Sequence, residues 1–238
     1  MEFDRIYAEV DLGRIEENME AMKEHLRPGT KMYGVVKTDA YGHGAVPVAR
    51  TIDRFVCGYA VATVDEGLKL RRHGIEKEIL SLGPVSAGRY QECLENDISL
   101  PVFEYRRAKE LSDAAVAEGK TAKIHIAVDT GMSRIGLFPD EGSVETVKEI
   151  AELPALRIAG MFTHFARADE ADKTNAGEQY RRFHAFCDAV KAAGVEVPVC
   201  HCSNSAGIVE LPDFNMDAVR AGITIYGLYP SDEVKQDI

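Results

Sequence analysis

The sequence predicts an α/β protein that forms one closed (β/α)₈ barrel, the TIM-barrel fold. Eight apolar runs bounded by turn residues alternate with segments of helical periodicity. Most of the runs are continuously apolar, which is typical of parallel strands covered by helices. Eight such units in 238 residues fit a barrel, whereas an open doubly wound sheet usually has about five or six strands. The expected strands are residues 31–37, 55–62, 78–82, 98–103, 122–129, 156–163, 197–201 and 218–225.

A helix is expected before the first strand, because four apolar residues recur at spacings of three and four. Asp11 has the side chain of an N-cap, and the Pro-Gly pair at 28–29 marks the end of this helix. Later segments repeat the pattern and stop at Gly119 and Gly194, as helices often do. The stripe of the leading helix consists of Ile15, Met19, Met22 and Leu26.

The composition excludes several classes of partner. A formal charge of −11 without any Lys/Arg block argues against nucleic acid and against an anionic membrane surface, since both need a concentrated basic patch. No run approaches the roughly 18 apolar residues of a membrane helix, and the first residues do not resemble a signal peptide. We therefore expect a cytoplasmic protein that acts on a small molecule.

The cysteines predict neither a disulfide framework nor a metal site. There are five, an odd number, and no Cys-x-x-Cys spacing occurs. The run 200–202, Cys-His-Cys, lacks a fourth ligand at usable spacing, and successive side chains of a strand point to opposite faces. We expect reduced thiols and no bound metal.

Polar residues gather where the expected strands end, and barrel enzymes of this type carry their chemistry at those ends. Lys37 follows an apolar run, and apolar walls favour the neutral, nucleophilic amine that Schiff-base chemistry needs. The loops after strands seven and eight usually bind phosphate in such barrels, and Ser205, Gly222 and Ile223 lie there. A phosphate-bearing aldehyde cofactor would satisfy both features.

Each of these residues also has a simpler interpretation. Lys37 could extend from a strand end into solvent, and Asp129 could pair with Arg134 across a turn. His164 could be a core histidine, and the Ser-Asn-Ser run at 203–205 is ordinary turn chemistry. The convergence of these residues on one rim of the barrel favours a functional site.

Five motifs resemble those of a known family. Residues 35–44, Val-Val-Lys-Thr-Asp-Ala-Tyr-Gly-His-Gly, are similar to the cofactor-lysine signature of the alanine racemases, which use pyridoxal 5'-phosphate (PLP). The other motifs occur in the family's order, so the resemblance covers nearly the whole chain. It implies a barrel of the PLP-binding alanine racemase type. The other motifs are residues 129–136, 162–166, 201–206 and 220–228.

The resemblance also implies roles. Lys37 would hold the cofactor aldehyde as an imine and act as the catalytic base on one face of the substrate Cα. The phosphate would be bound by Tyr41, Ser205, Gly222 and Ile223. The substrate would be alanine, interconverted between its L and D forms to supply D-alanine for peptidoglycan, and the intact enzyme would be a homodimer.

The remaining roles concern the cofactor ring. Arg134 would contact the phenolic oxygen and the substrate, and His164 would lie against the ring near Arg220. Asn204 would support the cofactor, and Arg220 would face the pyridine nitrogen. Because an arginine stays protonated and only donates, Arg220 would keep that nitrogen unprotonated. We hypothesise that the weaker electron sink favours racemisation over transamination.

The sequence departs from the family in two ways. Members continue into a mostly β domain that supplies a tyrosine, across the dimer interface, as base for the opposite face, and we find no such domain here. Some members have a modified lysine where this chain has Ala127, so Arg134 needs another partner or an anion. We expect residues 1–11 to form a strand that packs on the missing domain. Residues 12–228 would form the PLP-binding barrel, and 229–238 would begin the connection to that domain.

A chain with one of the two bases should bind PLP and show little racemase activity alone. Three other functions remain open. The protein could be a PLP-carrying barrel without racemase activity, or a racemase for serine or for several amino acids. It could also be a Schiff-base aldolase without any cofactor. The racemase motifs at 129–136 and 226–228 favour the PLP-dependent alanine racemase over these alternatives.

Overall fold

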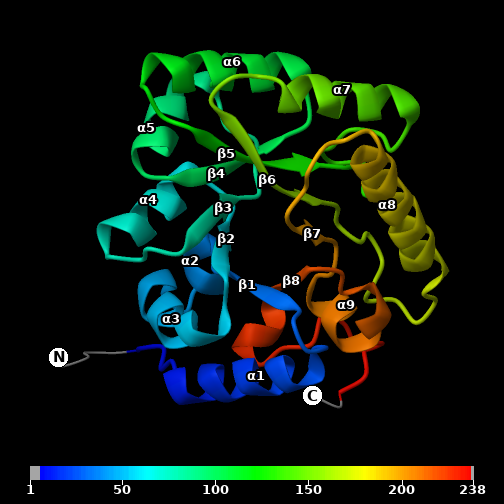
Figure 1. Ribbon diagram of the computed structural model, residues 1–238. Coiled ribbons are helices and arrows are strands. Elements are labelled where there is room, and N and C mark those ends of the chain that lie inside the picture. The colour runs from blue at the N-terminus through cyan, green and yellow to red at the C-terminus, as the bar shows by residue number, and fades with distance from the viewer. Residues whose placement is uncertain (1–5, 237–238) are drawn as a thin grey trace.

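The computed structural model describes residues 6–236 of the chain. Their eight strands are parallel and close into a barrel in sequence order, β1 to β8, with β1 hydrogen-bonded to both β2 and β8. Helices surround this barrel (Figure 1). The predicted (β/α)₈ fold is confirmed. The strands are β1 (Lys31–Val35), β2 (Gly58–Val61), β3 (Glu78–Ser81), β4 (Ile98–Val102), β5 (Ala122–Ala127), β6 (Leu156–Phe162), β7 (Cys200–His201) and β8 (Ala218–Ala221).

The helices follow the strands in the alternating order that the sequence predicts, and short 3₁₀ turns (η) complete several connections. None of the helices among residues 6–236 is both long and apolar enough to cross a membrane. The α-helices are α1 (Leu12–His25), α2 (Lys37–Tyr41), α3 (Ala45–Ile52), α4 (Val64–Arg72), α5 (Tyr90–Glu95), α6 (Tyr105–Ala117), α7 (Glu141–Ala151), α8 (Thr174–Ala192) and α9 (Ser205–Glu210). The 3₁₀ turns are η1 (Asp53–Phe55), η2 (Ala87–Arg89), η3 (Pro212–Phe214) and η4 (Ile223–Tyr226).

The leading helix α1 completes the outer layer of the barrel. Its N-cap is Asp11, as expected, whose carboxylate accepts the backbone N–H of Arg14 at 3.1 Å. The helix packs against α3, α9 and η4, the short turn after β8 (Figure 1). The buried face carries Ile15, Met19 and Met22. Because a 3₁₀ turn is the only helical element after β8 within residues 6–236, α1 fills the gap that a helix after β8 would otherwise occupy.

Several strands are shorter than predicted, at their start or at their end, and local chemistry explains each case. Lys37 lies in α2 rather than in β1, because the backbone turns into the left-handed region at Thr38. Residues 223–225 lie in η4 rather than in β8. The predicted strand 197–201 shrinks to two residues, since Pro198 has no N–H to donate to a ladder. Phe55 belongs to η1, which continues α3.

The two ends of the described chain differ. Residues 6–10 have no regular secondary structure, and Ile6 is 89% exposed. Residues 1–5 lie outside the described part, so the expected packing of residues 1–11 on another domain stays a prediction. The tail after η4 packs on the barrel, where Val234 is buried and Glu233 accepts the N–H of Ala171 at 2.5 Å.

Candidate active site

A cavity of about 550 Å³ opens at the carboxyl ends of the strands. All nine site residues expected from the sequence line it, although they come from five separate segments of the chain. The sequence analysis did not assign the rest of the lining, which is mostly apolar. The nine residues are Lys37, Tyr41, Arg134, His164, Asn204, Ser205, Arg220, Gly222 and Ile223, and the unassigned lining includes Val35, Leu82, Met132, Phe162, Phe165 and Pro230.

Lys37 stands at the start of a left-handed helical turn, α2. The four residues from Thr38 to Tyr41 have φ between 51° and 56°, although none is glycine. This conformation costs about 1–2 kcal/mol per residue, so the surrounding structure must hold it. A left-handed turn also has about 3.6 residues, so Lys37 and Tyr41 lie on the same side. The amine of Lys37 is 5.8 Å from the centre of the Tyr41 ring, and both line the cavity.

The loop after β8 forms a small cradle opposite the Tyr41 hydroxyl. A Cβ atom on Gly222 would lie 3.4 Å from the Tyr41 hydroxyl oxygen and 3.5 Å from Ser205 Oγ. The Gly222 N–H donates to Ser205 Oγ at 3.0 Å, and the Thr224 hydroxyl donates to the same oxygen at 3.0 Å. Since the Ser205 oxygen accepts these bonds, its own O–H can donate into the cradle. The absence of a side chain at Gly222 therefore leaves a hollow bordered by hydroxyl groups.

Tyr226 supports this side of the cavity. Its hydroxyl donates to the carbonyl oxygen of Val35 at 2.9 Å. The ring stacks on His43 with 4.6 Å between centres and lies 5.0 Å from the Tyr41 ring. The family-like run 226–228 therefore contributes a packing residue that holds Tyr41 in place.

Arg134 is carried by a tight loop after β5. The Asp129 carboxylate accepts the backbone N–H groups of Gly131 at 3.0 Å and Ser133 at 2.9 Å. Leu137 donates its N–H to Ala127 and closes the loop. Asp129 therefore shapes the turn instead of pairing with Arg134. Within residues 6–236, no hydrogen bond or ion pair is found for the exposed Arg134 side chain.

Arg220 lies on β8 and is almost completely buried, with 3% of its surface exposed. Nη1 donates to His201 Nδ1 at 2.7 Å and to the His201 carbonyl at 3.1 Å. Nη2 donates to the carbonyls of Thr163 and Cys202 and to His164 Nδ1. Among the described residues, no partner is found for Nε. Burial lowers the pKa of Arg220 to about 10, so it remains a cation at neutral pH.

His164 is neutral in this arrangement. Arginine can only donate, so the Nδ1 atom of His164, 3.2 Å from Arg220 Nη2, must accept. The ring proton therefore lies on Nε2. Burial lowers the pKa of His164 to about 3, and the positive charges of Arg220, Arg134 and Lys37 add to the effect. A neutral imidazole can lie against a ligand ring without adding another positive charge.

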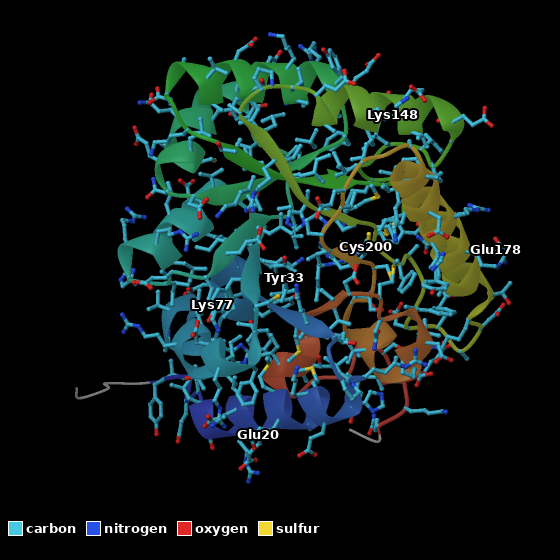
Figure 2. The ribbon with its side chains drawn as sticks, in the orientation of Figure 1. Glu20, Tyr33, Lys77, Lys148, Glu178 and Cys200 are labelled. Carbon is cyan, nitrogen blue, oxygen red and sulfur yellow. The ribbon has the colours of Figure 1, made fainter. Side chains whose placement is uncertain are left out.

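A hydrogen-bonded chain crosses the barrel beneath the cavity. His201 Nε2 is 3.1 Å from His125 Nδ1, and His125 Nε2 is 3.2 Å from Glu78 Oε1. Glu78 also accepts the hydroxyl of Tyr33, near the centre of the barrel in Figure 2, at 2.7 Å. Because Arg220 donates to His201, each histidine must accept on Nδ1 and donate from Nε2. The chain is therefore directional, and burial keeps the pKa of His201 well below its ordinary value, so His201 is neutral.

This chain ends in an ionised carboxylate. Burial alone would raise the pKa of Glu78, but hydrogen bonds from His125, Tyr33 and Ser99 lower it to about 2. The sequence analysis missed His125 and Glu78. His125 lies inside an apolar run, and Glu78 lies at the start of a strand, where a charged residue is common. The available signal was a polar side chain at an interior position of the barrel.

The cavity is suited to an anionic ligand. Lys37, Arg134 and Arg220 are basic, and Asp169 is the only acidic residue in the lining that the structure describes. The run Cys200-His201-Cys202 is part of the barrel floor, since the His201 ring is hydrogen-bonded to Arg220 and His125. Across residues 6–236, no group of three or more His, Cys, Asp or Glu side chains is arranged to hold a metal ion.

The family model described as alanine racemase, N-terminal domain, matches residues 10–230. The chain belongs to this family. The alanine racemase of Clostridium tetani is 40% identical over 97% of this chain, and that of Clostridium novyi is 45% identical over 96%. The chain spans about 60% of the length of these racemases, namely 60% and 59%.

Solved structures of the family have the same fold. Alanine racemase from Clostridium difficile 630 is 39% identical, with a TM-score of 0.93, and the match covers 95% of this chain and 59% of that one. Alanine racemase from Bacillus anthracis with bound L-Ala-P is 37% identical, with a TM-score of 0.87 and coverage of 98% and 61%. The barrel described above is therefore the fold of the N-terminal domain of alanine racemases.

Proposed function

We propose that this chain is the cofactor-binding barrel of an alanine racemase, which uses PLP to interconvert L- and D-alanine and supplies D-alanine for peptidoglycan. The observation that carries the proposal is the cavity of about 550 Å³ that contains the amine of Lys37, the cradle at Gly222 and two arginines. Sequence identity of 40–45% with alanine racemases of Clostridium supports the choice of substrate.

The residues present fit PLP. The space that Gly222 leaves open is bordered by hydroxyl groups, because a Cβ atom there would meet those of Tyr41 and Ser205 at 3.4 and 3.5 Å. Those two hydroxyls and the N–H of Ile223 are donors that a phosphate needs, and the Gly222 N–H, which donates to Ser205 Oγ at 3.0 Å, fixes the Ser205 hydroxyl beside them. We assign phosphate binding to these four residues and a supporting role to Asn204, which caps α9.

The other assignments follow from charge. Arg134 carries a positive charge with no protein partner among residues 6–236, so it can bind the phenolic oxygen of the cofactor and the carboxylate of the substrate. Arg220 can donate from Nε to the pyridine nitrogen, because Nη1 and Nη2 are already bonded to the barrel. His164 stays neutral and lies against the ring.

When bound, the cofactor would supply an aldehyde that bonds to the Lys37 nitrogen with loss of one water molecule and then withdraws electrons from the substrate. Once the substrate amine had replaced the Lys37 nitrogen on that aldehyde carbon, the released Lys37 amine would remove the proton from the substrate Cα, or return it, on one face. Racemisation needs a second acid/base group on the other face. Because the racemases compared above are longer than this chain, we propose that the rest of such a protein supplies that group across a homodimer interface.

The first experiment is a visible spectrum of this chain with PLP. We expect an absorption band that borohydride bleaches, and we expect Lys37→Ala to abolish it. Lys148→Ala is the matched control, because Lys148 lies on the outer helix α7 (Figure 2) and should leave the band unchanged. A band that persists in Lys37→Ala would exclude Lys37 as the attachment site.

A second experiment separates a racemase domain from a PLP carrier. The chain is incubated with PLP and either enantiomer of alanine in deuterated water, and deuterium at Cα is followed by NMR. With one acid/base group on one face, we expect faster exchange for one enantiomer and little racemisation. No exchange with either enantiomer would indicate a carrier, and faster exchange with serine would indicate a different substrate.

A further inference from the structure

Glu66 connects two loops that border the cavity. It lies in the first turn of α4, and its side chain is half-buried. Oε1 accepts the backbone N–H of Thr38 at 2.7 Å, and Oε2 accepts the backbone N–H of Ala62 at 2.7 Å. Thr38 directly follows Lys37, and Ala62 lines the cavity after β2. One carboxylate therefore joins the Lys37 turn to the neighbouring loop.

The turn that receives this bond is strained. Thr38 has φ 51° and ψ 47°, and a β-branched residue in the left-handed region is a conformational outlier. Three more residues continue in the same region up to Tyr41. The first N–H groups of any helical turn have no partner inside the turn, and Thr38 carries one of them. Glu66 satisfies that group at the point where the strain begins.

A second contact from α4 reaches the same turn. Asp39 Oδ1 accepts the N–H of Ala45 at 2.9 Å and the amine of Lys69 at 2.7 Å. Lys69 follows Glu66 by one turn of α4, so α4 touches the strained segment twice. The Lys69 pair is about half exposed, at 45% and 51%, and such pairs contribute little to stability. Glu66 is therefore the stronger of the two contacts.

Capping of α4 does not account for Glu66 by itself. The capping box with Thr63 uses two bonds of 3.4 Å, one from Thr63 N–H to Glu66 Oε2 and one from Glu66 N–H to Thr63 Oγ1. The two bonds of 2.7 Å go to Thr38 and Ala62 instead. Both oxygens face N–H donors, so only a carboxylate satisfies them, and a glutamine would direct its own NH₂ against one donor.

We propose that Glu66 is a positioning residue: it holds the backbone after Lys37 in the left-handed turn, so that Lys37 and Tyr41 face the cavity together. The consequence for catalysis rests on the proposed function, since it assumes that Lys37 and Tyr41 hold PLP. The consequence for the backbone does not depend on any cofactor.

The first test uses amide hydrogen exchange of the chain without PLP. We expect Glu66→Gln to speed exchange at residues 38–42 about tenfold or more, as loss of a short bond to a charged acceptor implies. Thr63→Ala removes the capping bond and keeps the bridge, so it should speed exchange only in α4. If both variants affect α4 alone, the proposal is wrong. Should Glu66→Gln fail to fold, Glu66→Asp tests the same bridge with a shorter side chain.

The second test has two parts: whether Thr38→Gly restores the protection lost in Glu66→Gln, and whether Glu66→Gln slows the reaction of Lys37 with PLP. Thr38→Gly removes the steric cost of the left-handed conformation, so Glu66→Gln/Thr38→Gly should recover most of the lost protection. With PLP, Glu66→Gln should slow the appearance of the Lys37-dependent band about tenfold, while Thr63→Ala leaves it unchanged. If the unmodified chain forms no band, the proposed function fails. If it forms one and Glu66→Gln forms it equally fast with normal exchange, the role of Glu66 fails.

Discussion

Arg220 and Arg134 line the same cavity, but the protein holds them in different ways. Arg220 is 3% exposed and gives two guanidinium nitrogens to five acceptors of the barrel floor. Arg134 is exposed on a loop, and no partner for it is found in residues 6–236. The barrel therefore uses most of the donors of Arg220 for its own structure, whereas those of Arg134 remain for a ligand.

The two arginines therefore suit different tasks: Arg220 keeps a fixed orientation before any ligand arrives, and Arg134 is free to bind the ligand. A buried guanidinium with fixed acceptors keeps one orientation whether or not a ligand is present, which suits the proposed contact of its Nε with a ring nitrogen. An exposed arginine loses conformational freedom when it binds, and it can follow a substrate that enters and leaves. Substitutions at the two positions should consequently affect stability and binding in opposite proportions.

The largest expected effect is on stability and comes from Arg220→Ala. The substitution leaves the carbonyls of Thr163 and Cys202 and the Nδ1 atom of His201 buried without donors. We expect the free energy of unfolding to fall by about 3 kcal/mol, measured by urea denaturation. Arg181→Ala, on the exposed face of α8, is the control and should change it by less than about 0.5 kcal/mol. A similar small loss for Arg220→Ala would show that the barrel floor does not depend on this cation.

The next effect is at the other end of the same buried chain, and it depends on pH. The folded pKa of Glu78, about 2, lies below its ordinary value of 4.5. Its stabilisation is therefore present above about pH 5 and is lost as the pH falls towards 2. We expect Glu78→Gln to lower the free energy of unfolding by about 2–3 kcal/mol at pH 7, and by progressively less towards pH 3.

The measurement for Glu78 is urea denaturation of the parent and the variant from pH 7 to pH 3. Glu24→Gln, an exposed position on α1, is the control and should run parallel to the parent. A constant difference between the parent and Glu78→Gln at every pH would contradict the ionised carboxylate and assign its effect to packing alone.

The smallest expected effect on stability comes from Arg134→Ala. Because Arg134 has no bond to lose among the described residues, the free energy of unfolding should change by less than about 0.5 kcal/mol. Binding of PLP, followed by the Lys37-dependent band, should weaken roughly ten- to a hundredfold, as expected for one hydrogen bond to a charged group. If Arg134→Ala instead lowered the free energy of unfolding and left PLP binding unchanged, Arg134 would be a structural residue and the contrast with Arg220 would be wrong.

The sequence predicted more of the cavity rim than of the floor beneath it. Lys37, Arg134 and Ser205 could be assigned because each lies in a contiguous motif next to an expected strand end. The chain of His125, His201 and Glu78 could not be found in this way. Its bonds join residues 76 and 47 positions apart, and closure of the barrel alone brings them together.

The turn after Lys37 was not predicted from the sequence either, because it too depends on a contact between residues distant in the chain. The apolar run placed residue 37 in the first predicted strand, and local preference gives no reason to expect four successive left-handed residues without glycine after it. The turn is maintained by Glu66, whose bond to Thr38 spans 28 residues. Strand ends were misplaced at β7 and β8 for related reasons, because turns and side chains there replace ladder bonds.

By itself, the sequence determined the number and order of the strands, the family and nine of the residues that line the cavity. Periodicity and contiguous motifs encode these features locally. Only the tertiary structure decided that Arg220 is committed to the barrel floor while Arg134 is not, and that Glu66 stabilises the turn of Lys37. These properties depend on which buried donors meet which acceptors, and that is fixed only when distant strands and helices are packed together.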